Sequence, residues 1–362
     1  MLKSPFYDPY LSYEENFEEG PFGSFADGKI YKDSGEPQYD FMGQKVYLPF
    51  GIANGPLING KFVKAALDKG FDLVEYKDVR SKKLPCNPFP NVVPLQVKGN
   101  ITLENAEKGL IQAEDYGQPL TITNSFGIPS MDPDFWQKDL ADSVVYAKKG
   151  QVVIGGIQGT IPESGGFDAY LNDFVTVAKL LKETNVKIIE LNLSCPNEGA
   201  AHLLCFDYKR SAIVAEKVKN EIGNIPLIIK IAYFSNEVQL RNLVNGVGKI
   251  VQGISAINTI PAKVYKDKEH TVQSLPGEGR LWSGTCGHGI KWAGLEMVKR
   301  LKKIKEENNY EFSIDGVGGV VNPEDYLEYK EAGVDAVFSA TGAMWNPNLA
   351  IDIKEEVKKR AA

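Results

Sequence analysis

The fold of this chain is decided by the stretch Ile188-Ile189-Glu190-Leu191-Asn192-Leu193-Ser194-Cys195-Pro196-Asn197. Its first six residues are mostly apolar and β-favouring, as expected for a strand that is buried on both faces of a parallel sheet. Pro196 lacks the N–H that a sheet ladder needs, so the strand should end just after Cys195. Because the carboxyl ends of parallel strands open onto the ligand crevice, two amides, a hydroxyl and a thiol should surround one small volume.

The thiol in this stretch has two interpretations. A free cysteine is usually buried and inert, and the asparagines on either side of it can satisfy backbone groups at a turn. At the end of a parallel strand, the same thiol can transfer a proton while the amides donate and accept hydrogen bonds. Cys195 taken alone favours the first interpretation, so the other strand ends have to decide between them.

Length and composition indicate a soluble globular protein. The chain has 362 residues, of which 43% are hydrophobic and 24% are charged, and a single α/β barrel can have this length. The net charge of -6 predicts neither nucleic acid nor an anionic membrane surface as a partner, which makes a small molecule the expected ligand. No apolar run reaches 18 residues, so no membrane span is expected.

The cysteine and histidine patterns narrow the function classes. The four cysteines form no CxxC pair and have no secretory segment beside them, which predicts reduced thiols in the cytoplasm. The three histidines are far apart, and neither HExxH nor GxSxG occurs, so neither a metal site nor a serine hydrolase is predicted. The cysteines are Cys86, Cys195, Cys205 and Cys286.

Short apolar runs alternate with amphipathic stretches from about residue 47 onward, a pattern that predicts βαβ units. Helical periodicity is clear at 167–181 and 295–304, and Asn322-Pro323 begins another helix. Eight strands are expected, the number that closes a (β/α)8 TIM barrel. The predicted strands are 47–53, 72–76, 152–157, 187–193, 226–231, 254–258, 312–316 and 335–339.

Two segments depart from this alternation. Residues 1–46 have no sustained period and predict an N-terminal arm or irregular cap, with the barrel over 47–362. Residues 77–132 have many prolines and no convincing helical period, but they contain the apolar run Leu120–Asn124. This segment is predicted to be an enlarged second βα loop that returns over the barrel mouth and forms a wall of the active site.

The strand ends deliver polar groups to this mouth. Lys230 directly follows an apolar run, where a lysine is costly unless it points into a polar site, so a functional role is favoured over a structural ion pair. Small residues at the first strand end would allow a flat ring to approach the backbone. The strand-end groups are Ala53, Asn54, Gly55, Lys77, Asn192, Lys230, Asn258 and Thr259.

Glycine-rich turns near the last strands are typical of a phosphate site in a barrel. Gly318 and Gly319 by themselves are equally consistent with a simple tight turn. A dinucleotide fold is not expected, because these glycines come late and lack the full GxGxxG spacing. The glycine-rich segments are the loop Gly284–Gly289, the turn Asp315–Gly319 and the end Ser339–Gly342.

These motifs resemble those of the dihydroorotate dehydrogenases, FMN enzymes of pyrimidine biosynthesis that are built on a (β/α)8 barrel. The resemblance extends from about residue 47 to the end, and its most specific part is 192–197, with the cysteine that marks the soluble class 1 enzymes. Asn124-Ser125-Phe126-Gly127-Ile128 is similar to the substrate loop of the family. Asn258-Thr259 resembles its late Asn-Ser or Asn-Thr pair.

The resemblance implies a mechanism and a set of site residues. Cys195 would remove a proton from C5 of dihydroorotate while hydride passes from C6 to flavin N5, and Lys230 would stabilise the reduced flavin. Substrate binding is implied for Lys77, Asn124, Phe126, Gly127, Ile128, Asn192, Asn197, Asn258 and Thr259. FMN binding is implied for Ala53, Asn54, Gly55, Lys77, Asn192, Lys230, Gly284, Gly287, Gly318, Gly319, Thr341 and Gly342. A homodimer that passes electrons to fumarate is expected, or alternatively to NAD through a partner subunit.

Two other functions fit parts of the sequence. Asp78 stands where the family usually has a small hydroxyl residue, and an insertion near 262–280 is unusual. These features are also consistent with an FMN oxidoreductase that acts on another dihydropyrimidine. A flavin-free, phosphate-binding lyase or isomerase could instead use Lys230 as a Schiff-base or proton-transfer group.

Overall fold

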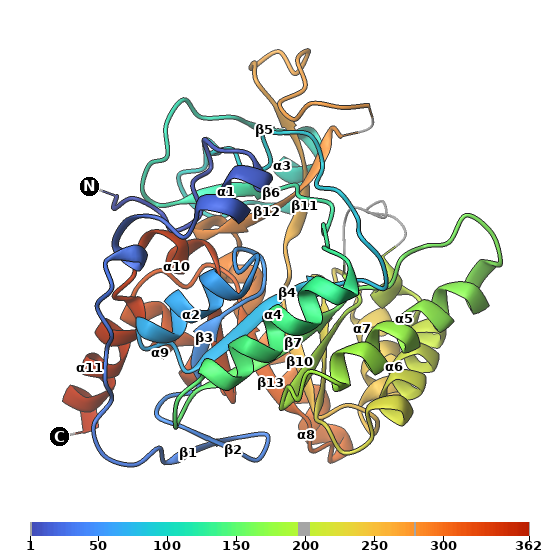
Figure 1. Ribbon diagram of the computed structural model, residues 1–362. Coiled ribbons are helices and arrows are strands. Elements are labelled where there is room, and N and C mark those ends of the chain that lie inside the picture. Colours follow the sequence, from blue (N-terminus) through green and yellow to red (C-terminus); the bar gives the residue numbers. More distant parts are fainter. Residues whose placement is uncertain (1, 195–202, 279, 362) are drawn as a thin grey trace.

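The computed structural model describes residues 2–194, 203–278 and 280–361. Eight parallel strands close into a barrel in the order β10-β13-β14-β3-β4-β7-β8-β9, with helices around it (Figure 1). The strands are β3 Phe50–Ile52, β4 Leu73–Val79, β7 Val152–Ile157, β8 Ile188–Asn192, β9 Leu227–Ile231, β10 Gly253–Ala256, β13 Ser313–Val317 and β14 Ala336–Ser339. Each predicted strand overlaps one of them, so the predicted TIM barrel is confirmed. β4 is longer than predicted, and Lys77 therefore lies within this strand rather than after it.

The helices bury one apolar face each against the barrel. In α5, Tyr170, Phe174 and Leu181 are buried on the predicted face. The predicted start of α9 is also confirmed, because the Asn322 side chain accepts a hydrogen bond from the Asp325 N–H. The helices that surround the barrel are α2 Gly60–Asp68, α4 Pro133–Tyr146, α5 Gly166–Lys182, α6 Tyr208–Ile222, α7 Glu237–Val247, α8 Lys291–Asn308, α9 Pro323–Ala332 and α11 Leu349–Ala361. Short turns of helix are η4 Leu204–Phe206, η5 His288–Ile290 and α10 Thr341–Trp345.

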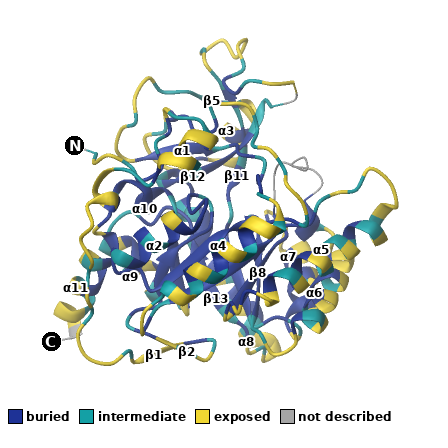
Figure 2. Ribbon diagram, viewed as in Figure 1, coloured by how far each residue is buried: buried dark blue, intermediate teal, exposed yellow. Residues whose placement is uncertain are grey.

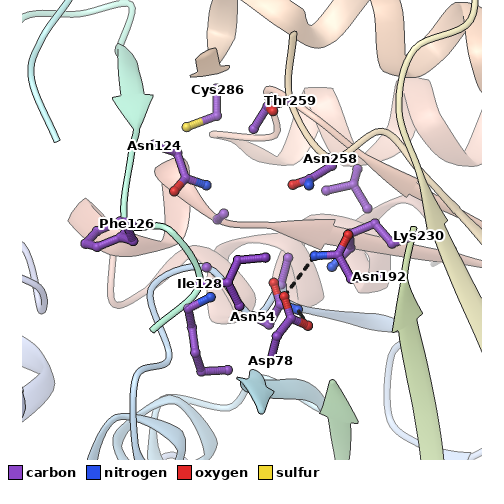
Figure 3. A pocket seen from close by; sticks show the side chains of 15 residues that line it. Asn54, Asp78, Asn124, Phe126, Ile128, Asn192, Lys230, Asn258, Thr259 and Cys286 are labelled. Carbon is purple, nitrogen blue, oxygen red and sulfur yellow. Dashed lines mark hydrogen bonds between the residues drawn. The ribbon is translucent and has the colours of Figure 1, made fainter. Parts of the chain in front are cut away.

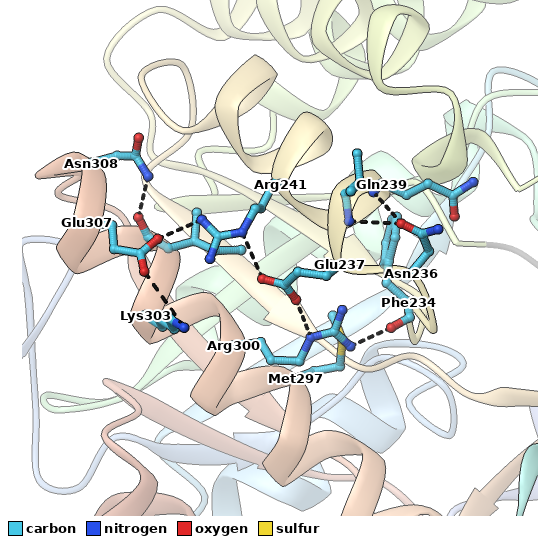
Figure 4. Close-up of polar contacts among 12 residues, drawn as sticks. Phe234, Asn236, Glu237, Gln239, Arg241, Met297, Arg300, Lys303, Glu307 and Asn308 are labelled. Atoms are coloured by element: carbon cyan, nitrogen blue, oxygen red, sulfur yellow. Dashed lines mark hydrogen bonds and ion pairs between the residues drawn. The ribbon is translucent and has the colours of Figure 1, made fainter.

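Burial is concentrated in the barrel strands, while the outer helix faces are exposed (Figure 2). On this outer surface, ion pairs join α7 to α8 (Figure 4). Arg241 pairs with Glu237 and with Glu307, and Arg300 also pairs with Glu237. Exposed ion pairs of this kind contribute little stability individually. None of the helices in the described ranges is both long and apolar enough to cross a membrane.

The N-terminal arm contains more regular structure than an extended segment. It forms helix α1 Tyr13–Glu19, the short helix η1 Gly23–Ala26, and a hairpin of β1 Tyr39–Phe41 and β2 Gln44–Val46. Helix α1 starts with a capping box, in which the Ser12 side chain accepts from the Glu15 N–H and the Glu15 carboxylate accepts from the Ser12 N–H. The arm therefore contains more helix and strand than its lack of a sustained period predicts.

The hairpin closes the amino-terminal end of the barrel. Phe41 and Val46 are buried with the apolar residues that fill this end, and the Phe41 ring lies 6.5 Å from the Phe338 ring. Figure 1 shows the hairpin at the bottom of the barrel, opposite the helix α1 side. This end is an apolar plug, so the functional polar groups have to lie further up the strands.

The opposite end is covered by a second sheet. Its four strands are β5 Leu110–Ile111, β11 Ile260–Tyr265, β12 Trp282–Gly287 and β6 Thr121–Asn124, in the order β5-β11-β12-β6. The predicted small strand in the enlarged loop is thus confirmed, but the loop also holds the helix α3 Leu103–Lys108, which was missed. Gly284–Gly287 was predicted to be a loop and instead forms part of β12, because it pairs with β6 and β11.

We expect Phe41→Ala to lower the free energy of unfolding by about 3–5 kcal/mol, because it leaves a cavity in the apolar plug. The matched control is Tyr39→Ala in the same strand, since Tyr39 is 44% exposed; its effect should stay within about 0.5 kcal/mol. Urea unfolding of the three proteins measures both changes. Equal losses in the two variants would show that the hairpin does not seal the barrel.

Candidate active site

One pocket lies at the carboxyl ends of the barrel strands, beneath the second sheet (Figure 3). It contains about 660 Å³ of space that protein atoms do not fill, including its open mouth. The residues predicted for the site that line it are Ala53, Asn54, Gly55, Lys77, Asn124, Phe126, Ile128, Asn192, Lys230, Asn258 and Thr259. Asp78, Cys286, Val317 and Ala340 line it as well and were not among the predicted site residues.

Other predicted residues lie beside the pocket or outside the described ranges. The neighbours are Gly127, Gly284, Gly287, Gly318, Gly319, Thr341 and Gly342, which do not line the pocket themselves. Several directly adjoin lining residues in the chain, as Gly318 follows Val317 and Thr341 follows Ala340. Gly342 lines a separate surface cleft together with His288 and Trp345. Cys195 and Asn197 lie outside the described residues.

Lys230 of β9 makes ion pairs inside the barrel. Its Nζ lies 3.0 Å from Glu75 Oε2 of β4, and it also forms an ion pair with Glu190 Oε1 of β8. All three side chains are at most 3% exposed. Lys230 also lines the pocket, so its ion pairs are compatible with the functional role that the sequence predicts. The ion pairs hold the ammonium in place at the pocket floor.

Three nearby carboxylates determine the charge of this lysine. Burial alone would lower the pKa of Lys230, but Glu190, Glu75 and Asp78 together raise that pKa above its ordinary value. Burial raises the pKa of Glu190 well above its usual range, and the negative charge of Glu75 raises it further. Lys230 is therefore held as a cation. A lysine that forms a Schiff base needs a lowered pKa, so this environment argues against a lyase of that kind.

Asp315 of β13 is a third buried carboxyl near Lys230, and we call Glu75, Glu190 and Asp315 together the acidic layer. Ser255 pairs in register with both Lys230 and Asp315, which puts these residues at one level of the barrel. Burial raises the pKa of Asp315 well above its ordinary value. In the described part of the chain, Glu75 Oε1, Glu190 Oε2 and Asp315 Oδ2 have no hydrogen-bond partner. Burial thus makes Glu190 and Asp315 hold their protons more tightly than exposed carboxyls do.

Asp78 orients two amides of the pocket. Its Oδ1 accepts a hydrogen bond of 2.6 Å from Asn54 Nδ2, and its Oδ2 accepts one of 2.9 Å from Asn192 Nδ2. Asn192 Oδ1 in turn accepts from the Ser194 N–H. Gly156 makes room for this arrangement, because a Cβ there would collide with Asp78 Oδ1. The carboxylate thus fixes which atom each amide presents.

The segment Asn124–Ile128 forms one wall of the pocket and offers backbone donors. Gly127 and Ile128 have φ angles of 81° and 49°, and the second value is unusual for a β-branched residue. The N–H groups of Phe126, Gly127 and Ile128 have no hydrogen-bond partner among the described residues. Successive N–H groups in such a conformation form a concave site for an anion. Figure 3 shows Asn124 facing Asn192 and Asn258 across the same space.

The model of the family described as dihydroorotate dehydrogenase matches residues 111–361. The chain belongs to this family. A dihydroorotate dehydrogenase of Dictyostelium discoideum is 35% identical over 370 residues, which cover 97% of this chain and 96% of the relative. Membership makes the chain an oxidoreductase that acts on a CH–CH bond of its donor.

More distant family members agree with this assignment. The catalytic subunit of dihydroorotate dehydrogenase B (NAD(+)) from Thermodesulfovibrio yellowstonii is 26% identical over 75% of this chain and 84% of its own length. A crystal structure of DHODH from Eimeria tenella in complex with ferulenol has a TM-score of 0.70 at 18% identity, covering 92% of this chain and 88% of that one. The structural match shows the shared fold. Both coverages indicate that the dihydroorotate dehydrogenase architecture is present over most of this chain.

The acidic layer predicts how the stability of this dihydroorotate dehydrogenase family member depends on pH. The folded-state pKa of Asp315 is raised above its ordinary value of 3.8. The folded protein therefore binds more protons than the unfolded chain above about pH 4, and the contribution of Asp315 to stability falls as pH rises. Asp315→Asn removes this titration. Relative to the variant, the wild type should lose up to about 1.4 kcal/mol per pH unit above pH 4.

Chemical unfolding at several pH values between about 4 and 8 measures this difference. Asp142→Asn is the matched control, because Asp142 is exposed on α4. Its stability curve should run parallel to that of the wild type. A parallel curve for Asp315→Asn would show that Asp315 titrates normally.

Proposed function

We propose that this chain oxidises dihydroorotate to orotate in pyrimidine biosynthesis, with FMN as its cofactor. The observation that supports this most is the convergence of Asn124 of β6, Asn192 of β8 and Asn258, which lies between β10 and β11, on one pocket. A cyclic substrate with alternating amide N–H and C=O groups suits several fixed amides. A buried site of this kind rejects analogues that leave its polar groups unpaired.

The residues of the pocket fit a flavin. Ala53, Val317 and Ala340 give it a small, apolar lining against which a flat ring can lie. Lys230 supplies a fixed positive charge beside this surface, and Asn54 and Asn192 supply oriented amides. Gly318 and Gly319, with φ angles of 127° and 73°, directly follow the lining residue Val317. We assign these two glycines, with Gly284, Gly287, Thr341 and Gly342, to the ribityl and phosphate groups.

Residues of the chain would bind the substrate and remove its proton. When bound, FMN supplies the acceptor for the hydride that leaves C6 of the substrate. Cys195 would take the proton from C5, and Asn197 would bind the substrate together with the three other asparagines, as the family resemblance implies. The N–H groups of Phe126, Gly127 and Ile128, which have no partner within the described part of the chain, receive the carboxylate. Lys230 keeps its charge throughout, because Glu75 and Glu190 hold it as a cation.

We further propose that the barrel of residues 47–362 is the FMN-binding unit, that the protein is a cytoplasmic homodimer, and that fumarate is its electron acceptor. The Dictyostelium relative, named dihydroorotate dehydrogenase, matches nearly the whole chain. The relatives named as NAD(+) catalytic subunits match less of this chain and at lower identity. Orotate formation with fumarate alone would support this acceptor, whereas formation only with NAD and an added subunit would reject it.

An anaerobic visible spectrum before and after addition of dihydroorotate tests the reaction itself. We expect a yellow protein whose flavin absorbance bleaches on addition of the substrate. A yellow protein that bleaches with another dihydropyrimidine and not with dihydroorotate would transfer the proposal to that substrate. A colourless protein that FMN cannot load would reject the flavin chemistry.

The proposed base predicts a pH dependence. A thiol with a reference pKa of about 8.5 is only a few per cent ionised at pH 7. The rate of flavin reduction in stopped flow should therefore rise about tenfold per pH unit from pH 6 and level off as Cys195 ionises. Cys195→Ala should retain flavin and be reduced about 10²–10⁴-fold more slowly.

Cys205→Ala provides the control, because Cys205 is buried and does not line the pocket. It should keep the rate and the pH profile of the wild type. A wild-type rate that is flat between about pH 6 and 9 would be incompatible with a cysteine base.

A further inference from the structure

The carbonyl groups of the substrate loop, Asn124–Ile128, are held from behind by donors of the surrounding loops. Ser125 O accepts hydrogen bonds from Arg280 Nη2 and from the side chains of Asn87 and Asn91. Phe126 O accepts from the Asn87 N–H at 2.9 Å and from Cys86 Sγ at 3.3 Å. Every one of these donors lies outside the pocket lining, so these carbonyls are engaged away from the ligand space.

The same two peptide groups direct their N–H away from these donors. A trans peptide is planar, and its N–H points opposite to its C=O. The peptide of Ser125 C=O carries the Phe126 N–H, and the peptide of Phe126 C=O carries the Gly127 N–H. Neither N–H has a partner among the described residues. A donor that binds the carbonyl polarises the peptide and strengthens the opposite N–H as a donor.

Among the donors to the Ser125 and Phe126 carbonyl groups, Arg280 is the charged one. It lies between β11 and β12, in the insertion that the sequence marks as unusual. Nη1 donates to Pro88 O at 2.8 Å and to Pro276 O at 2.7 Å, while Nη2 donates to Ser125 O at 3.0 Å and to Ser125 Oγ at 2.8 Å. One guanidinium thus joins the insertion, the enlarged loop and the substrate loop.

In the described ranges, no carboxylate lies within ion-pair distance of Arg280. Its hydrogen-bond acceptors there are all uncharged oxygens. Its Nε is buried without a hydrogen-bond partner there. An arginine stays protonated even when partly buried. The full positive charge is therefore available to an anion in front of the loop.

We propose that Arg280 is a positioning residue that gives this pocket its preference for a substrate with a carboxylate. It fixes Ser125, polarises the peptide that carries the Phe126 N–H, and adds a positive charge behind the anion site. This inference rests on the proposed function, because dihydroorotate is the anion concerned. It adds a residue from the insertion, for which neither the pocket lining nor the family motifs assign a role.

Arg80 provides an internal comparison. Its Nε donates to Ile128 O at 2.9 Å, at the other end of the loop. The next residue is Pro129, which has no N–H, so this contact polarises no donor toward the pocket. Arg80 therefore holds the loop in place, whereas Arg280 both holds it and strengthens its binding group.

The test compares Arg280→Met and Arg280→Lys with the wild-type flavoprotein. The dissociation constants of orotate and of its uncharged methyl ester are measured from the change in the flavin spectrum, together with KM and kcat for dihydroorotate. We expect Arg280→Met to weaken orotate binding and raise KM by about tenfold or more. Affinity for the ester and kcat should change by less than about threefold, and Arg280→Lys should recover part of the loss.

Lys263→Met is the matched control, because Lys263 lies in the same insertion and pairs with the exposed Glu107 instead of the loop. It should bind orotate like the wild type. If Arg280→Met binds orotate normally, or loses orotate and the ester equally, the inference is overturned. Should Arg280→Met fail to fold, Arg280→Lys has to lose more affinity for orotate than for the ester. A wild type that neither binds orotate nor oxidises dihydroorotate would instead reject the proposed function.

Discussion

The buried ion pairs of Lys230 with Glu75 and Glu190 are the constraint on which this site depends. An ammonium inside a barrel is tolerated only when carboxylates and hydrogen bonds replace its hydration. The three groups come from three strands, β4, β8 and β9. They therefore meet only when these strands pair in the barrel. Removing Lys230 alone would leave two buried carboxylates without a cation, which costs more than replacing the whole cluster with apolar side chains.

The rest of the molecule is layered along the barrel axis around this cluster. Below it, apolar side chains and the β1–β2 hairpin exclude water. Above it, Asp78 orients two amides at the pocket floor, and the enlarged loop brings Asn124 from the second sheet. In the proposed function, the barrel supplies a fixed cation, apolar contacts and the amides of Asn192 and Asn258, while the enlarged loop adds Asn124 and the N–H groups of Phe126–Ile128. Catalysis by positioning requires this rigidity.

Much of this arrangement could be predicted from the sequence, because strongly apolar runs and the polar groups that follow them are local signals. Such local signals predict the eight strands and the convergence of Asn192, Lys230 and Asn258. The polar groups at the strand ends do not predict the acidic layer, because Glu75, Glu190 and Asp315 lie within strands and not after them. The contacts of Arg280 could not be predicted, because they join segments about 155 residues apart and depend on how two loops fold together. The Ser12–Glu15 capping box of α1 is also a local signal, because both residues stand at the start of that helix in the sequence.

A crystal structure of the protein with orotate tests the central claim most directly. We predict that the pyrimidine ring lies among Asn124, Asn192 and Asn258, with its carboxylate at the N–H groups of Phe126–Ile128 and a flavin between the ring and Lys230. Orotate bound elsewhere, or with its carboxylate directed at Lys230 in a pocket without flavin, would contradict the account.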